Sequence, residues 1–144
     1  MSALVCFSIL GIVSANSPEP VPIPHFPDRL HAFVWRNWPL VPIEQLTKTL
    51  GCGRVELETL AQGMGLPVPQ PSISEDQLKR SYITVIRRNW HLLPLEQIQA
   101  ILGWDADQLQ FTLKEDDFLY IKLGSHKPHC EPLRYTPPSD YDKQ

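Results

Sequence analysis

The tripeptide Arg36-Asn37-Trp38 returns 52 positions later as Arg88-Asn89-Trp90. Around it, 10 of the 25 gapless pairs between Arg36–Leu60 and Arg88–Thr112 are identical. Self-similarity at a fixed period is the signature of a repeated structural unit. We therefore interpret the chain as two copies of one short unit. Further shared positions are Pro42, Glu44, Gln45, Leu50 and Gly51 in the first copy and Pro94, Glu96, Gln97, Leu102 and Gly103 in the second.

Each copy has the pattern of three short helices. In the first copy, Asp28 is a good N-cap, and apolar residues follow it at helical spacing as far as Trp38. A second helix begins at Pro42 and ends at Gly51, because proline suits the first turn and glycine the C-terminal cap. A third helix covers about 54–62, before Gly63, Gly65 and Pro67.

In the second copy we expect helices at about 75–90, 94–102 and 106–115. Two capping-box patterns mark its boundaries, Ser74 with Gln77 and Asp105 with Gln108. Residues 117–123 either continue the last helix or form an apolar arm. The predicted fold class is all-α, with two tandem three-helix, helix-turn-helix-like repeats and proline-rich linkers.

The 15 prolines, about twice the usual share, divide the chain into segments. They cluster between and beside the helical patterns, where they favour extended backbone and end helices. The expected organisation is a signal peptide at 1–15, a proline-rich linker at 16–27, helical repeat 1 at 28–66, a linker at 67–73, helical repeat 2 at 74–124 and a proline-rich tail at 125–144.

The first 15 residues predict export to the periplasm or the medium. An apolar run from Ala3 to Val13 is followed by Val13-Ser14-Ala15, a small-residue pattern of signal-peptidase sites. No Lys or Arg precedes the run, so a cytoplasmic protein with a buried N-terminal strand or helix is the alternative. The run is too short to span a membrane. Cleavage would leave Cys52 and Cys130, either as buried thiols or as a pair.

The helix, glycine turn and helix of each copy also resemble a helix-turn-helix, which makes a DNA-binding regulator the alternative function. A recognition helix needs cations that face the phosphates. Here residues 105–117 carry five acidic residues and one lysine, Lys114, and the whole chain has a net charge of −3. The charge therefore argues against nucleic acid as a partner.

Surface aromatic and basic residues are the candidate binding residues. Trp35 and Trp104 have no tryptophan counterpart in the other copy, and Arg87 and Arg88 belong to the main basic cluster. The shared positions are interpreted as structural: the tryptophans as core, the asparagines as helix caps and the first-turn glutamates as partners of the helix dipole. The structural set is Arg36, Asn37, Trp38, Glu44, Gly51, Arg88, Asn89, Trp90, Glu96 and Gly103.

Chemistry-bearing patterns are weak. His126, His129 and Cys130 lie close in sequence but have no fourth ligand at a zinc-site spacing. Asp116 and Asp117 are neighbours whose side chains diverge on a helix, and no phosphate-binding loop or nucleophile elbow occurs. We expect no metal, no cofactor and no catalytic residue, so the chain is predicted not to be an enzyme.

The stretch Arg88–Trp104, with Glu115–Leu119 and Lys122-Leu123-Gly124 after it, resembles a helical segment near the N-terminus of large secreted proteins. Those proteins are similar to carbohydrate-active proteins and have a glycoside-hydrolase-like region downstream. The resemblance covers about residues 36–135 and implies a non-catalytic accessory or interaction module. The partners it implies are a protein or a downstream domain, or a carbohydrate.

Overall fold

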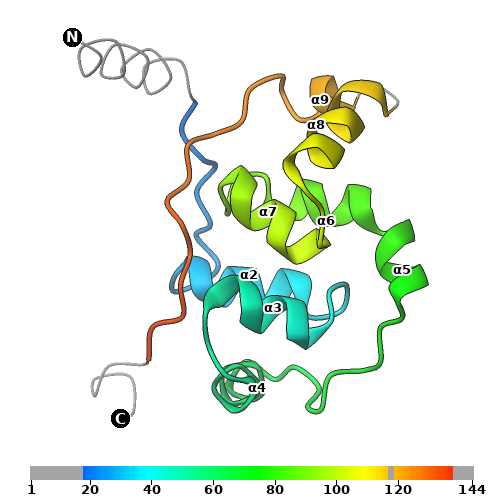
Figure 1. Ribbon diagram of the computed structural model, residues 1–144. Coiled ribbons are helices and arrows are strands. Elements are labelled where there is room, and N and C mark those ends of the chain that lie inside the picture. The colour runs from blue at the N-terminus through cyan, green and yellow to red at the C-terminus, as the bar shows by residue number, and fades with distance from the viewer. Residues whose placement is uncertain (1–17, 117–118, 138–144) are drawn as a thin grey trace, which may run out of the picture.

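The computed structural model describes residues 18–116 and 119–137, and all regular secondary structure within them is helical (Figure 1). This confirms the all-α prediction. The predicted signal peptide and Asp117 lie outside the described residues. The helices are α2 (Arg29–Asn37), α3 (Ile43–Leu50), α4 (Arg54–Gly63), α5 (Glu75–Arg80), α6 (Tyr82–Asn89), α7 (Leu95–Leu102), α8 (Ala106–Glu115) and α9 (Leu119–Lys122).

The predicted caps form at the helix ends. The carboxylates of Asp28 and Asp105 each accept a hydrogen bond from a backbone N–H three residues later, and Ser74 makes a complete capping box with Gln77. The capping box predicted for Asp105 and Gln108 is only half formed, because the Gln108 side chain makes no return bond to the Asp105 N–H in the described residues. At the other end, Gly51 and Gly103 are left-handed, with φ of 71° and 70°, a conformation that glycine adopts without strain. The local signals therefore place these helix ends correctly.

One predicted helix, at 75–90, is divided into α5 and α6. The break lies at Ser81, where φ is −94° and ψ is 4°. Its hydroxyl donates to the Gln77 carbonyl oxygen at 2.7 Å, and its backbone N–H is shared between the Gln77 and Leu78 carbonyls. A serine side chain that bonds back to the preceding turn competes with the helical ladder, which accounts for the break.

The helices of the first copy pack against those of the second. α3 lies against α7 and α2 against α6, so that one continuous apolar core runs through both copies. Trp38 and Trp90, each 1% exposed, lie in this core, as predicted. Other fully buried side chains are Phe33, Leu46, Leu50, Leu57, Ile86, Leu92, Leu93, Ile98, Ile101 and Leu109.

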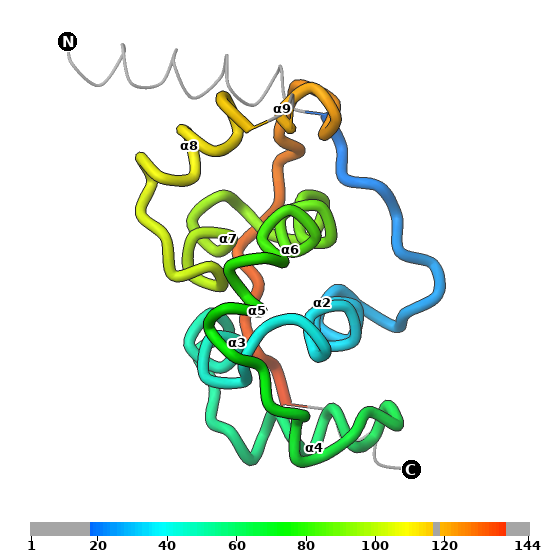
Figure 2. The backbone as a smooth tube through the Cα atoms, turned by 90° about the vertical axis from the view of Figure 1, so that its right-hand side faces the viewer, coloured from blue at the N-terminus to red at the C-terminus, as the bar shows by residue number. Residues whose placement is uncertain are grey.

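Two segments without regular structure run along the outside of this core. In Figure 1 residues 18–28 and 125–137 both run on the side away from α5. Figure 2 shows them apart, with 125–137 behind the helices and 18–28 beside them, and the His129 N–H joins them by a hydrogen bond to the Pro18 carbonyl oxygen at 3.4 Å. The sequence predicts a proline-rich tail at 125–144. In its described part Cys130 and Leu133 are buried, so this part packs against the helices.

Two further findings concern the thiols and the helix lengths. Cys52 is half-buried, Cys130 is buried, and both are free thiols. Burial raises the pKa of the Cys52 thiol, and Glu56 adds to the effect. Within the described residues, every helix is too short or too polar to cross a membrane.

Candidate functional site

A polar network at the centre of the interface joins the two copies. Asn37 and Asn89 are both fully buried. Each donates from Nδ2 to the other's Oδ1, at 2.8 and 2.7 Å. Each also donates to the carbonyl oxygen four residues earlier, that of Phe33 or Val85. Both donors of each amide are thus used, which a buried polar group requires. The asparagines are therefore a joint between α2 and α6, and the prediction of simple helix caps misses this role.

The arginines of the repeated tripeptide make a second reciprocal contact beside the first. Arg88 Nη1 donates to the Arg36 carbonyl oxygen at 2.6 Å, and Arg36 Nη1 donates to that of Arg88 at 3.4 Å. Neither guanidinium has a carboxylate partner in the part of the chain that the structure describes. Two positive charges consequently remain available at the surface where α2 and α6 meet.

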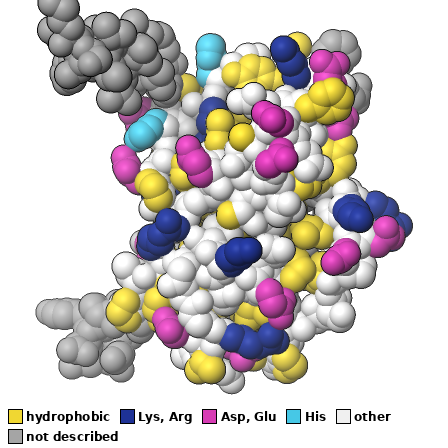
Figure 3. Space-filling view, in the orientation of Figure 1, with side chains coloured by type: hydrophobic (Ala, Val, Ile, Leu, Met, Phe, Trp, Pro, Cys, Tyr) yellow, Lys and Arg dark blue, Asp and Glu magenta, His cyan; other side chains and the backbone are white. Residues whose placement is uncertain are grey.

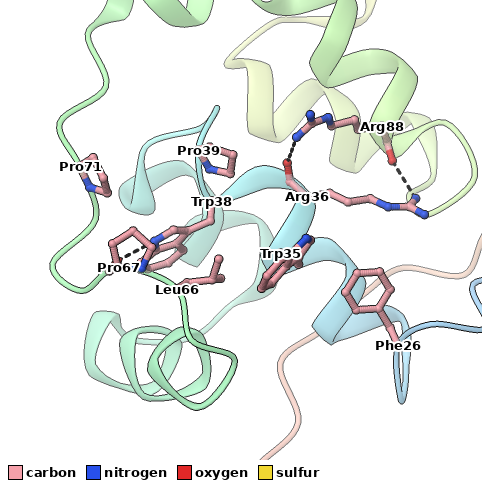
Figure 4. A pocket seen from close by; sticks show the side chains of 9 residues that line it. All are labelled: Phe26, Trp35, Arg36, Trp38, Pro39, Leu66, Pro67, Pro71 and Arg88. Carbon is pink, nitrogen blue, oxygen red and sulfur yellow. Dashed lines mark hydrogen bonds between the residues drawn. The ribbon is translucent and has the colours of Figure 1, made fainter.

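A groove with aromatic and proline walls opens next to these arginines (Figure 4). We call it the Trp35 groove. Its volume is about 530 Å³, and it is lined by Phe26, Trp35, Arg36, Trp38, Pro39, Leu66, Pro67, Pro71 and Arg88. The size falls within the range of sites that hold small ligands or a few side chains of a partner.

The walls of the groove are held in place by residues from three segments. Trp38 closes its floor and donates from Nε1 to the Pro67 carbonyl oxygen at 2.8 Å, which fixes the segment after α4 against α2. Gln70 ties the same segment to the loop after α2, because its Nε2 donates to the Trp38 and Val41 carbonyls. Phe26 packs at 6.4 Å from Trp35, ring centre to ring centre. The groove is thus built on fixed elements.

Trp35 is the main exposed feature of the groove. Its side chain stays 46% exposed, whereas Trp38 is buried and Phe26 and Leu66 are half-buried. Among the described residues, no Asp or Glu lines the groove, whereas Arg36 and Arg88 do. The site therefore combines an exposed indole, proline and leucine walls and unpaired positive charge.

The structure brings together only part of the predicted binding set. Trp35 and Arg88 line the same groove, whereas Arg87 is exposed outside it. Trp104 lies elsewhere, half-buried against Tyr82 with ring centres 5.6 Å apart. Sequence reasoning misses Phe26, Pro67 and Pro71, because they fall in segments interpreted as linkers. The signal that points to them is the presence of isolated apolar residues, Phe26 and Leu66, within proline-rich sequence.

The first-turn glutamates of the two copies differ in their contacts. Glu44 accepts from Arg54 Nη1 at 3.0 Å, and Arg54 also bonds Glu58 at 2.9 Å. Glu96 occupies the same place in the first turn of α7 without this partner, since position 106 is alanine. Arg54 is the only cation of α4, so its two ion pairs leave that helix without a free positive charge.

Groups with possible chemistry are not assembled into a centre. Among the described residues, no three His, Cys, Asp or Glu side chains are placed to hold a metal ion. His129 instead bonds Glu131, and Cys130 lies 3.6 Å from Lys127 Nζ. Burial lowers the pKa of that lysine, whose ammonium also lies 5.5 Å from the centre of the Trp90 ring. These contacts fix the C-terminal segment against the second copy.

Comparison with known proteins gives no relative for this chain. No family model, curated protein or solved structure matches it. The Trp35 groove must therefore be interpreted from its own chemistry.

Proposed function

We propose that this protein is a non-catalytic interaction module and that the Trp35 groove is its binding surface. The observation that carries the proposal is the exposed Trp35 indole between proline walls and two arginines without carboxylate partners. Tryptophan and arginine are the residues that most often dominate protein interfaces. A groove held by the core, with a large exposed aromatic side chain, is typical of a preformed docking site.

The chemistry of the groove favours an extended segment of a partner protein. Its apolar walls suit an aromatic or proline side chain, and Arg36 and Arg88 favour a carboxylate beside it. Guanidinium groups that already bond backbone carbonyls are also held in position, so that little side-chain entropy is lost on binding. The ligand we propose is a peptide with an aromatic or proline residue next to Asp or Glu.

We also interpret the chain as two tandem three-helix units, exported and flanked by proline-rich segments. The reciprocal contacts between Asn37 and Asn89 and between Arg36 and Arg88 support this interpretation, because positions 52 apart make the same bonds. An accessory module of a carbohydrate-active protein fits this arrangement. Sequencing the N-terminus of the protein after expression in bacteria tests export: Asn16 at the terminus supports it, and Met1 in the cytosol contradicts it.

A peptide library tests the proposed ligand. Random heptapeptides displayed on phage are selected on the wild-type protein and counter-selected on Trp35→Ala. We expect enriched peptides that contain an aromatic residue or proline beside Asp or Glu. Trp35→Ala should weaken binding of a synthetic consensus peptide by about tenfold or more, as expected for an aromatic anchor.

Arginine variants supply the matched control. Arg88→Gln removes a charge from the groove but keeps a donor for the Arg36 carbonyl. It should weaken binding of the consensus peptide and make the remaining binding less dependent on salt concentration. Arg87→Gln removes the same charge one residue away, outside the groove, and should leave binding unchanged. A peptide that binds Trp35→Ala as tightly as the wild type contradicts the proposal.

Carbohydrate is the second candidate ligand, because an exposed indole face beside guanidinium donors can stack on a sugar ring and bond its hydroxyls. If the protein binds a glycan on an array, Trp35→Ala abolishes this binding and the phage selection enriches no peptide, the ligand of the groove is a sugar. The DNA-binding alternative has less support. Arg54 is paired with two glutamates, and the face drawn in Figure 3 mixes Lys and Arg with Asp and Glu.

A further inference from the structure

The last described residues of the chain pack against the helices as a bound extended segment. We call residues 130–137 the C-terminal arm. The amide of Gln97, itself only 6% exposed, binds the backbone of Leu133 on both sides. Gln97 Oε1 accepts from the Leu133 N–H at 2.6 Å, and Nε2 donates to the Leu133 carbonyl oxygen at 2.7 Å and to that of Thr49 at 3.1 Å. One glutamine thus joins the arm to the end of α3.

The arm also satisfies the last carbonyl groups of α3. The Arg134 guanidinium donates to the Thr49 carbonyl oxygen at 2.8 Å, and the Tyr135 N–H donates to that of Leu50 at 3.2 Å. The final carbonyls of a helix have no partner within it, so an extended chain that supplies donors is stabilising there. The Leu133 side chain is buried in the same place. The receptor for the arm consists of Gln97 and the C-terminal end of α3, from Thr49 to Gly51.

The same receptor elements occur at the positions 52 residues away. Gln45 corresponds to Gln97, and Ile101, Leu102 and Gly103 correspond to Thr49, Leu50 and Gly51. They also lie together in space, since Gln45 Nε2 is 3.9 Å from the point where a Cβ on Gly103 would stand. Gln45 and Leu102 line a common cleft of about 380 Å³, with Leu78, Tyr82 and Trp104 as its apolar walls. We call it the Gln45 cleft.

In contrast to its counterpart, the Gln45 cleft has unused hydrogen-bonding groups. The Gln45 side-chain amide makes no hydrogen bond within the described residues. At the end of α7, the N–H groups of Gly103 and Trp104 bond Ala100 and Gln99, which leaves the Ile101 and Leu102 carbonyls without a partner in the described part of the chain. The corresponding carbonyls at the end of α3, those of Thr49 and Leu50, accept hydrogen bonds from the arm. Residues of α5 line the cleft. α5 lies on the side of the molecule opposite the arm (Figures 1 and 2).

We propose that the Gln45 cleft binds an extended peptide segment of a partner protein, in the way that Gln97 binds the arm. The side-chain amide of Gln45 pairs with the N–H and C=O of one residue, whose apolar side chain enters the space between Leu78 and Trp104. The next residue donates to the Leu102 carbonyl, because Leu102 lines the cleft whereas Ile101 is fully buried. The cleft is distinct from the Trp35 groove, so the protein has two separate docking sites for extended chains.

The arm itself is the best available probe, because its sequence fits the corresponding receptor. The experiment adds a blocked peptide with the sequence of residues 131–137, Glu-Pro-Leu-Arg-Tyr-Thr-Pro, to the isotope-labelled full chain and follows amide NMR signals. We expect saturable shifts at Leu102, Gly103 and Trp104. The bound arm is covalently tethered at a high effective concentration, so the free peptide should not displace it from α3. A peptide with serine in place of leucine should bind at least about tenfold more weakly.

Substitutions distinguish the cleft from non-specific association. Gln45→Ala should weaken binding by about tenfold, the effect expected from losing two hydrogen bonds. The matched control is Gln99→Ala, a half-buried glutamine on α7 that does not line the cleft, and it should leave binding unchanged. Shifts confined to Thr49, Leu50 and Gly51, shifts that persist in Gln45→Ala, or no saturable shifts with millimolar peptide would each overturn the proposal.

Discussion

The buried asparagine pair permits a sharp test of how the two copies are joined. In the variant Asn37→Ala, Asn89 loses both hydrogen bonds to its partner, so its Oδ1 and one Nδ2–H remain buried without a partner. Each buried unsatisfied group costs about 1–3 kcal/mol. We therefore expect Asn37→Ala to lower the free energy of unfolding by about 3 kcal/mol. For a domain of this size the melting temperature should fall by about 10 °C or more.

The double variant Asn37→Ala/Asn89→Ala removes the unsatisfied groups together. The carbonyls of Phe33 and Val85 keep their helical partners, so the second substitution should cost much less than the first. We expect the double variant to lose about 2 kcal/mol less free energy of unfolding than the sum of the losses of the two single variants. Urea unfolding followed by circular dichroism measures this coupling. Effects that add within about 0.5 kcal/mol would show that the asparagines do not act as a pair and would refute the reasoning.

Three further predictions concern the outer segments and the tryptophans. The Val21 N–H donates to His91 Nδ1 at 3.1 Å, and burial, with Lys127 and Arg36 nearby, lowers the pKa of His91 below its unfolded value of about 6.5. The neutral ring therefore contributes to the free energy of unfolding above that value, and this contribution is lost as the pH falls below it. In urea unfolding between about pH 8 and pH 5, the free energy of unfolding of His91→Gln should depend less on pH than that of the wild type. Leu133→Ala should lower the free energy of unfolding by about 2–3 kcal/mol and increase hydrogen exchange at the arm, whereas unchanged exchange contradicts its docking. Trp38→Ala should cost about 3–5 kcal/mol in thermal unfolding, but Trp35→Ala less than about 1 kcal/mol, because only Trp38 lies in the core.

The local structure could be predicted because each signal acts within a few residues. Asp28, Ser74 and Gly51 fix helix ends through bonds to their own neighbours, and the apolar spacing fixes which faces are buried. Ser81 shows the limit of this reasoning. Its position in an otherwise helical pattern does not reveal whether its hydroxyl faces water or the preceding turn, and that choice divides the predicted helix.

The interface and the grooves could not be predicted because they join residues that are distant in sequence. Asn37 has the pattern of a helix cap, and only the folded chain shows that its partner is the same residue of the other copy. A polar residue that recurs in both copies at a buried position is nevertheless a signal for such a pair. The packing of Leu133 and Phe26 could not be predicted for another reason. A single apolar residue in proline-rich sequence has no periodicity, so its burial depends entirely on a distant receptor.

Comparison between the two copies separates scaffold from binding surface. The identical asparagines Asn37 and Asn89 make the same contacts in each copy and hold the core together. The exposed groove combines the shared residues Arg36, Trp38 and Arg88 with positions that differ, since Trp35 corresponds to Arg87 and Pro39 to His91. In the second copy, Lys127 lies over the Trp90 ring, which covers the surface that corresponds to the groove floor. A pair of fused units can therefore keep a shared interior while each outer face acquires its own ligand, and substitutions at the divergent exposed positions should change binding without changing the fold.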